Sequence, residues 1–340
     1  MKRWIIILLS LISGVSYARL GGSGAVFLEN GCGARPLAMG GAYASFAQGI
    51  EAVYWNPAGL TTLSSACINF THANLFAGIM EENIGFAVPI ANGAIGVSAI
   101  GLFSGNMEVT TEEQRYQGGT GEKFSYNDIA VGISYARRLT EKFSAGITVK
   151  GIGEFTRRVS STGVGLDFGA IYNTKIRDLR FGFVIQNFGP DMAFRGEELD
   201  TLMAKDTLQD EDVPARWKSE SYSMPITFQG GFAIDVIKTP ETRLTLVCEI
   251  THPIDQPATD AIGIEYAKNE GFFLRMGHTL KNNRGFSLVD VPDPLPQIIP
   301  NAYGAGIKTS VGGRPFLLDY TLEQHEYLGL IHRLSLGISL

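Results

Sequence analysis

The sequence is poor in charged residues, has few cysteines and lacks a long uninterrupted apolar segment. Only 18% of its 340 residues are charged, against roughly a quarter in an ordinary soluble domain. Cationic residues are in the minority, since 28 Lys and Arg stand against 34 Asp and Glu for a net charge of −6. This balance argues against a nucleic-acid partner, because phosphate binding depends on Lys and Arg.

The apolar stretch near the N-terminus, from Trp4 to Ile12, is well short of the roughly 20 residues that a membrane-spanning helix needs. It follows Lys2 and Arg3 and precedes the small residues of Ser16-Tyr17-Ala18. This order is typical of a secretory signal peptide with a cleavage site. We therefore expect residues 1–18 to be removed and the chain to be exported.

Groups that perform catalysis or bind metal do not form a recognisable constellation. The three cysteines leave at least one unpaired, which argues against a disulfide framework. The glycine-rich run at residues 118–123 lacks the Gly-Lys-Ser/Thr ending of a phosphate loop. The histidine of His325-Glu326 has no second histidine at metal-ligand spacing. We expect no enzyme activity, no cofactor and no metal site.

Glycine and aromatic residues are plentiful, with 41 Gly, 20 Phe and 12 Tyr. From Ala66 onward, large apolar residues alternate with small or polar ones. The clearest example has Ile129, Val131, Ile133 and Tyr135 alternating with Asp128, Ala130, Gly132 and Ser134. A period of two predicts β-strands with two unlike faces.

We expect about fourteen such strands, at residues 66–74, 82–90, 94–103, 126–138, 142–154, 162–174, 179–188, 222–237, 241–252, 259–268, 271–280, 301–310, 314–323 and 329–340. Every second connection between consecutive strands is a short turn, such as Asn92-Gly93 or Gly312-Gly313. Three of the other connections are long, at residues 104–125, 189–221 and 281–300. Short turns at one end and long loops at the other are typical of a bacterial outer-membrane barrel.

A soluble β-sandwich also shows alternation, but it has no reason to keep this parity of connections. Its apolar face would point inward, which would leave an outer surface too sparsely charged for solubility. In a membrane barrel the same charges line a polar lumen; they are Asp128, Asp167, Glu249, Glu265 and Asp319. The predicted fold class is therefore all-β, an antiparallel transmembrane β-barrel of about fourteen strands with an N-terminal luminal segment.

The segment at residues 19–65 does not alternate, so we expect it to form a unit distinct from the barrel at residues 66–340. The wall positions that face inward are mostly Gly, Ala and Ser. Side chains of this size cannot fill the lumen of so wide a barrel, so another segment must occupy it. We expect residues 19–65 to form this hatch, or plug.

Two blocks of the predicted hatch carry a family resemblance. Ala34–Ala42 (ARPLAMGGA) and Val53–Leu60 (VYWNPAGL) resemble the N-terminal signature of the PorV/PorQ family, relatives of the FadL-type outer-membrane transporters. The segments at residues 318–320 and 332–337 are similar to that family's last two strands. Family members often carry an acidic pair between the two blocks, where this chain has Gln48-Gly49.

The resemblance implies a fourteen-stranded barrel with a hatch in its lumen. Its most specific element, the expected hatch motif, consists of Tyr54, Trp55, Asn56, Pro57, Ala58 and Gly59. In FadL-type proteins the third strand is interrupted to make a side opening. Gly96 and Gly101 in the third strand of this chain are compatible with such a kink.

The predicted loop at residues 281–300 is apolar and rich in proline. Such a segment at a barrel mouth suits contact with a hydrophobic ligand. The candidate ligand-contacting residues are Leu288, Val291, Leu295 and Ile298.

Two functions stay open at this point, together with a purely structural barrel. The first is a FadL-like channel for small hydrophobic compounds such as long-chain fatty acids. The second is a PorV-like component of type IX secretion that binds exported proteins. Both place the chain in the bacterial outer membrane, with outer-membrane lipid as a partner. They differ in the other partner, which is a hydrophobic solute in one case and an exported protein in the other.

Overall fold

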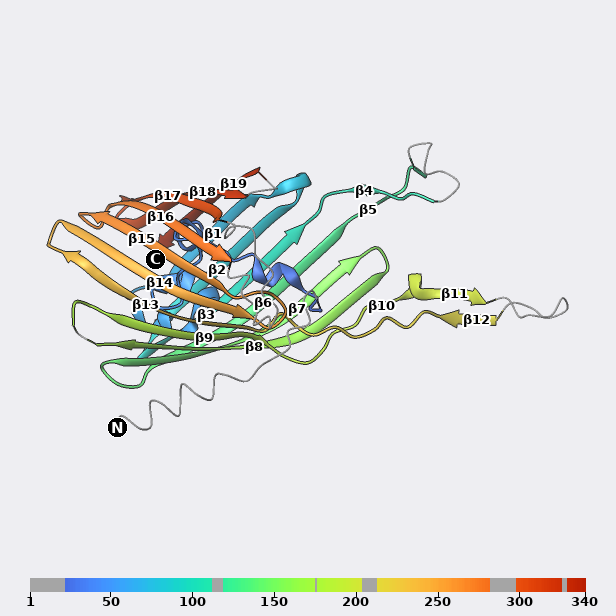
Figure 1. The fold of residues 1–340 in the computed structure, drawn as a ribbon, viewed down its shortest axis with the longest axis horizontal. Coiled ribbons are helices and arrows are strands. Elements are labelled where there is room, and N and C mark those ends of the chain that lie inside the picture. The colour runs from blue at the N-terminus through green and yellow to red at the C-terminus, as the bar shows by residue number, and fades with distance from the viewer. Residues whose placement is uncertain (1–21, 112–118, 175, 204–212, 282–297, 326–328) are drawn as a thin grey trace, which may run out of the picture.

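The computed structural model describes residues 22–111, 119–174, 176–203, 213–281, 298–325 and 329–340. The predicted signal peptide at residues 1–18 lies outside this range. Fourteen antiparallel strands close into a barrel (Figure 1). In chain order they are β1 (Cys67–Asn74), β2 (Met80–Ile90), β3 (Gly93–Phe103), β6 (Tyr126–Arg138), β7 (Phe143–Thr156), β8 (Val159–Asn173), β9 (Arg180–Phe188), β13 (Thr227–Lys238), β14 (Thr242–Pro253), β15 (Thr259–Lys268), β16 (Phe272–Lys281), β17 (Ile298–Val311), β18 (Arg314–His325) and β19 (Gly329–Ser339).

Each barrel strand pairs with its neighbours in the chain, and the first pairs with the last. The ladder between β1 and β19 runs from Cys67 opposite Ser339 to Asn74 opposite His332. This ladder closes the sheet, so every barrel strand has a partner on both sides. The predicted fold class is thereby confirmed, with backbone groups paired as a membrane requires.

The two faces of the wall follow the predicted alternation. In β6, Val131 and Ile133 are 47% and 62% exposed, whereas Asp128 and Ser134 are buried. The other predicted lumen charges are buried as well, namely Asp167, Glu249, Glu265 and Asp319. Apolar side chains outside and charges inside are the reverse of a soluble core and fit a barrel surrounded by lipid.

The two ends of the barrel differ in their connections. At one end the strands join through short turns, in which Asn92, Gly312 and Gly313 take positive φ angles, the conformation that tight hairpins need. The other end carries the β1–β2 connection with η4 (Phe76–Gly78) and the longer extensions β4 (Met107–Glu108), β5 (Lys123–Phe124), β10 (Arg195–Gly196), η5 (Glu197–Leu199), β11 (Asp200–Met203) and β12 (Val213–Arg216). The β4–β5 and β11–β12 hairpins extend well beyond the barrel (Figure 1). In outer-membrane barrels the short turns are the ones that face the periplasm.

Three predicted strand starts are wrong by three residues or more, one of them the start of β8, which lies at Val159 and was predicted at residue 162. β17 begins at Ile298, inside the predicted loop at residues 281–300, where it pairs with the end of β16 across a register shift. The strand predicted at residues 222–237 begins only at Thr227 as β13. Tyr222 instead bridges to Met192, because the segment before β13 folds across β8 and does not extend the ladder.

The segment before β1 folds inside the barrel, and we call residues 22–65 the hatch. It contains η1 (Val26–Glu29), α2 (Ala34–Ala38), η2 (Gly49–Glu51), α3 (Ala52–Trp55) and η3 (Pro57–Thr62). Its core is fully buried at Met39, Tyr43, Phe46, Ala58 and Leu60. Among the described residues, no helix has the length and apolarity to cross a membrane.

Candidate functional site

The Asn56-Pro57 step connects different parts of the hatch through hydrogen bonds. The Asn56 side chain caps η3, since its Oδ1 accepts a hydrogen bond from the Ala58 N–H at 3.1 Å. Its Nδ2 donates to the carbonyl oxygens of Ala44 at 2.7 Å and of Ala170, in β8, at 3.2 Å. Pro57 opens η3, where its missing N–H would have no helical partner. Asn56 therefore ties together two parts of the hatch and the wall.

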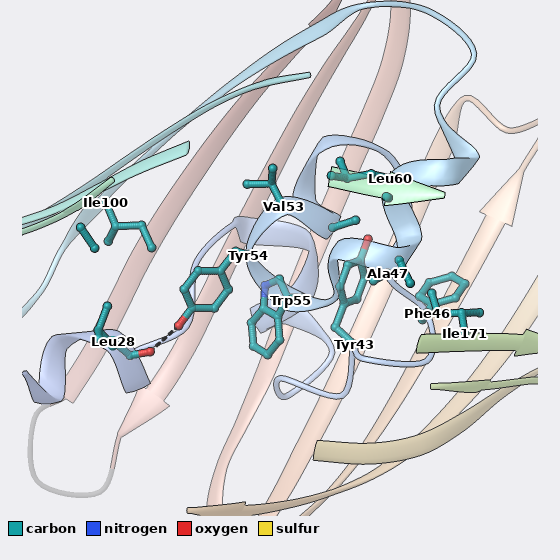
Figure 2. Close-up of a cluster of buried hydrophobic side chains, with 14 of the residues drawn as sticks. Leu28, Tyr43, Phe46, Ala47, Val53, Tyr54, Trp55, Leu60, Ile100 and Ile171 are labelled. Atoms are coloured by element: carbon teal, nitrogen blue, oxygen red, sulfur yellow. Dashed lines mark hydrogen bonds between the residues drawn. The ribbon is translucent and has the colours of Figure 1, made fainter. Parts of the chain in front are cut away.

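Tyr54 and Trp55 hold α3 against the start of the hatch. The Tyr54 hydroxyl donates to the Leu28 carbonyl at 2.6 Å, and the Trp55 Nε1 donates to the Cys32 carbonyl at 2.8 Å. Figure 2 shows Tyr54 reaching Leu28, with Trp55 packed beside it and Tyr43 on the other side of Trp55. The hatch motif is thus brought together by the fold, as a structural core that excludes water.

Glycines of the wall let the hatch backbone come very close. A Cβ on Gly277 of β16 would collide with the Gly40 backbone, and one on Gly182 of β9 with the backbone of Ser45. A Cβ on Gly146 of β7 would lie 2.6 Å from the Ala58 nitrogen. Only glycine fits such approaches of two backbones. The glycine content of the chain therefore has a structural cause in the fit of the hatch.

A buried ionic cluster joins the hatch to the strands β14, β15, β16 and β18. Arg35 of the hatch donates two hydrogen bonds to Glu265, at 2.8 and 3.0 Å. Glu265 also accepts from Arg275 at 2.7 Å and from Arg243 at 3.0 Å. Arg275 in turn lies 2.5 Å from Asp319. The Glu265 carboxylate is therefore the centre of the cluster, and its three guanidinium partners compensate its burial.

Further polar contacts hold the hatch around the lumen. The Ala44 N–H donates to Glu249 of β14 at 2.6 Å, and the Ala34 N–H donates to Ser335 of β19 at 2.8 Å. Gln186 of β9 donates to the Tyr54 carbonyl at 2.6 Å. These bonds satisfy hatch backbone groups that would otherwise be unpaired in the interior.

Glu29 of η1 ties the loop-side end of the hatch to the connection between β14 and β15. Its carboxylate accepts a hydrogen bond from Gln256 at 2.6 Å. Burial, followed by repulsion from Asp255, raises the pKa of Glu29 from 4.5 to about 7. This attachment therefore changes charge near neutral pH.

The other predicted site residues have different positions. β3 runs through Gly96 and Gly101 with paired ladders on both sides and no register shift along its described length. A Cβ on Gly96 would lie 2.6 Å from a methyl group of Val53, and one on Gly101 2.6 Å from the ring of Phe103. These glycines therefore make room for the side chains of Val53 and Phe103, and β3 continues past both positions without a break in its pairing.

The loop predicted to contact ligand lies mostly outside the described residues, including Leu288, Val291 and Leu295. Ile298 belongs to β17 and pairs through its backbone with Leu280. Among the described residues, no group of three or more His, Cys, Asp or Glu is placed to hold a metal ion.

Sequence reasoning missed the ionic cluster and the roles of the wall glycines. Alternation placed Glu265 and Asp319 on the lumen face, but the partner Arg35 lies 230 residues away from Glu265 in the chain. The signal that could have helped is the position of Arg35 in a small-residue block, where a lone cation requires a buried partner.

The fold is similar to that of solved transporters. The toluene transporter TodX of Pseudomonas putida matches with a TM-score of 0.59 at 12% identity, over 91% of this chain and 97% of that chain. The toluene transporter TbuX of Ralstonia pickettii matches with a TM-score of 0.57 at 12% identity, over the same shares. No protein-family model and no curated protein sequence matches the chain. The chain therefore shares its barrel fold with these two solved structures, which are transporters.

Proposed function

We propose that this protein is an outer-membrane channel for small hydrophobic compounds. The observation that carries the proposal is a hatch with an apolar core that occupies the lumen of a barrel with an apolar outer belt. A wide water-filled pore would serve polar solutes, whereas an apolar solute needs a route that avoids water. The two toluene transporters share this fold along nearly their whole length.

Within this proposal, residues 1–18 are the export signal and residues 19–65 are the closing element. Monoaromatic compounds and long-chain fatty acids are both candidate solutes, since each is apolar. The PorV-like secretion role, suggested by the PorV/PorQ resemblance, is the alternative that the test has to separate.

The test compares uptake with cargo secretion. The chain is expressed in a bacterial host that lacks its own transporter for hydrophobic compounds, and uptake of labelled toluene and of a labelled fatty acid is measured. We expect uptake above that of a host carrying an empty vector. The double variant Asn56→Ala/Pro57→Gly loosens the hatch without changing any ladder bond, so it should alter uptake while heat-modifiable migration on gels stays intact.

Asn127→Ala is the matched control, because Asn127 lies in β6 and its side chain donates to Ser125, away from the hatch. It should transport like the wild type. Two results together would favour the secretion role over the channel. Uptake would stay at the empty-vector level for every solute, and the double variant would lose secretion of the exported proteins that type IX secretion handles.

A further inference from the structure

The hatch leaves two cavities against the wall. The larger, of about 310 Å³, opens at the short-turn end. Its lining includes Leu63 of the hatch, Cys67 and Leu317 of the wall, and the charged side chains of Arg35, Arg243, Arg275 and Lys308. Its volume is at the lower end of the range of about 300–1,000 Å³ that small-molecule pockets occupy. The smaller, of about 30 Å³, lies deeper, between Cys32 and the wall beside Ile100.

The two cavities meet at three residues. Ile50, Glu51 and Asn69 line both of them. Ile50 closes the narrowest point from the hatch side, since a Cβ on Gly85 of β2 would lie 3.2 Å from its side chain. The two cavities are separate in this structure, with Ile50 between them, and the smaller has room for no more than a few water molecules.

The segment that carries Ile50 is less buried than the helix that follows it. None of the three residues of η2 is fully buried, whereas all four residues of α3 are. Gly49, at the start of η2, has a positive φ and open space where a Cβ would be. Few buried contacts are what a locally opening segment has.

Three polar contacts hold η2 in place. The Gly49 N–H donates to the Thr62 hydroxyl at 2.9 Å. The Tyr43 hydroxyl donates to Glu51 at 2.8 Å, and Arg35 lies 3.8 Å from the same carboxylate. The other carboxylate oxygen of Glu51 is buried without a hydrogen-bond partner among the described residues. Glu51 therefore tethers η2 to the ionic side of the hatch through one oxygen only.

We propose that the solute passage runs between the hatch and β1–β3, and that Ile50 on η2 is its gate. The passage leads from the smaller cavity past Ile50 and Asn69 into the larger cavity and out at the short-turn end. Release of the Tyr43–Glu51 bond lets η2 swing about Gly49 and joins the cavities. This inference rests on the proposed function for the nature of the solute, but the passage itself is tested without any solute.

The chain contains its own reporters for this test. Cys67 lines the larger cavity and Cys32 the smaller, so they lie on opposite sides of Ile50. Cys248 alternates along β14 with the buried Val247 and Glu249 and thus faces lipid. All three thiols are free. Variants that keep one cysteine each are purified in detergent and treated with a charged methanethiosulfonate.

In the wild type we expect Cys67 to react faster than Cys32 and Cys248 to react least. Ile50→Ala should raise the rate for Cys32 about tenfold, because labelling of a buried group follows how often its surroundings open. Tyr43→Phe, which removes the tether, should raise it in the same direction. Leu37→Ala is the matched control, since Leu37 is also a half-buried apolar residue of the hatch but lines neither cavity.

Conductance in planar bilayers and solute uptake complete the test. Ile50→Ala should raise the single-channel conductance, whereas Ile50→Trp and Gly85→Leu, which fill the constriction from its two sides, should lower uptake. Higher conductance and faster Cys32 labelling without uptake of any apolar compound would keep the passage and remove the proposed function. Equal Cys32 labelling in Ile50→Ala and Leu37→Ala, with wild-type uptake in Ile50→Trp, would overturn the passage.

Discussion

The hatch meets the two sides of the lumen through different atoms. Toward β7, β9, β15 and β16 its backbone touches the backbone of the wall, as at Gly277 and Gly182. Toward β2 and β3 the contacts are made by the side chains of Ile50 and Val53. A backbone that lies against another backbone has no rotamer with which to yield, whereas a side chain has several. We call the side with backbone-to-backbone contacts the anchor, and the side toward β2 and β3, with side-chain contacts, the seam.

The anchor also carries the ionic cluster around Glu265. Glu265 and its three arginine partners lie on this side, whereas the smaller cavity lies along the seam. The difference suggests that a hatch can remain attached while part of its perimeter opens. Three predictions test this contrast, beginning with the one expected to have the largest effect.

Glu265→Ala should have the largest effect, because it leaves the buried guanidinium group of Arg275 and the partly buried ones of Arg35 and Arg243 without their shared carboxylate. Breaking a buried ion pair from one side costs about 3–5 kcal/mol. The loss is measured as the urea midpoint of hatch unfolding in detergent, from the fluorescence of Trp55 in a Trp217→Phe background. Ser98→Ala, at the smaller cavity, should leave the midpoint almost unchanged, and equal losses in both variants would end the distinction between anchor and seam.

Gly277→Ala should have a medium effect. The added methyl group collides with the backbone at Gly40, and overpacking of this kind costs about 1–3 kcal/mol. Gly85→Ala, at the seam, meets only the movable side chain of Ile50 and should cost less. Gly151→Ala in β7 has open space around its Cβ and serves as the control. The same unfolding assay ranks the three, and a reversed order of Gly277 and Gly85 would contradict the contrast.

The smallest effect is a pH dependence at the outer end of the hatch. Because the pKa of Glu29 is raised from 4.5 to about 7, folded protein holds this proton more tightly than unfolded protein. The attachment is therefore stronger below about pH 4.5 and weakens as the pH rises through about 7. Hydrogen exchange at residues 26–29, corrected for its intrinsic pH dependence, should speed up over this range, and Glu29→Gln should remove the change.

Local patterns predicted the wall better than the lumen. The strand expected at residues 126–138 has the same bounds as β6, because alternation and turn residues are read within one strand. The bounds of β17 and β13 were less accurate, since their starts depend on what the adjoining loops contact. The pairing of Arg35 with Glu265 could not be predicted, because alternation indicates a face and carries no information about the partner across the lumen.

The gate candidate is a further example. Ile50 is one apolar residue in a short non-alternating segment, and nothing in its neighbours distinguishes it from Leu37. Its position became meaningful only when two cavities met at its side chain. The hatch motif was easier, since Asn56 and Pro57 carry local turn chemistry.

The ladder between β1 and β19 also dictates the order of events during assembly. Its partners, such as Cys67 and Ser339, stand at opposite ends of the barrel sequence, so the wall cannot close before the last strand has been exported. Ala34 of the hatch contacts Thr321 of β18 and Ser335 of β19 through its carbonyl and N–H groups. Its docking site is therefore complete only when those two strands have arrived, and enclosure of the hatch and closure of the wall become one late, long-range step in folding.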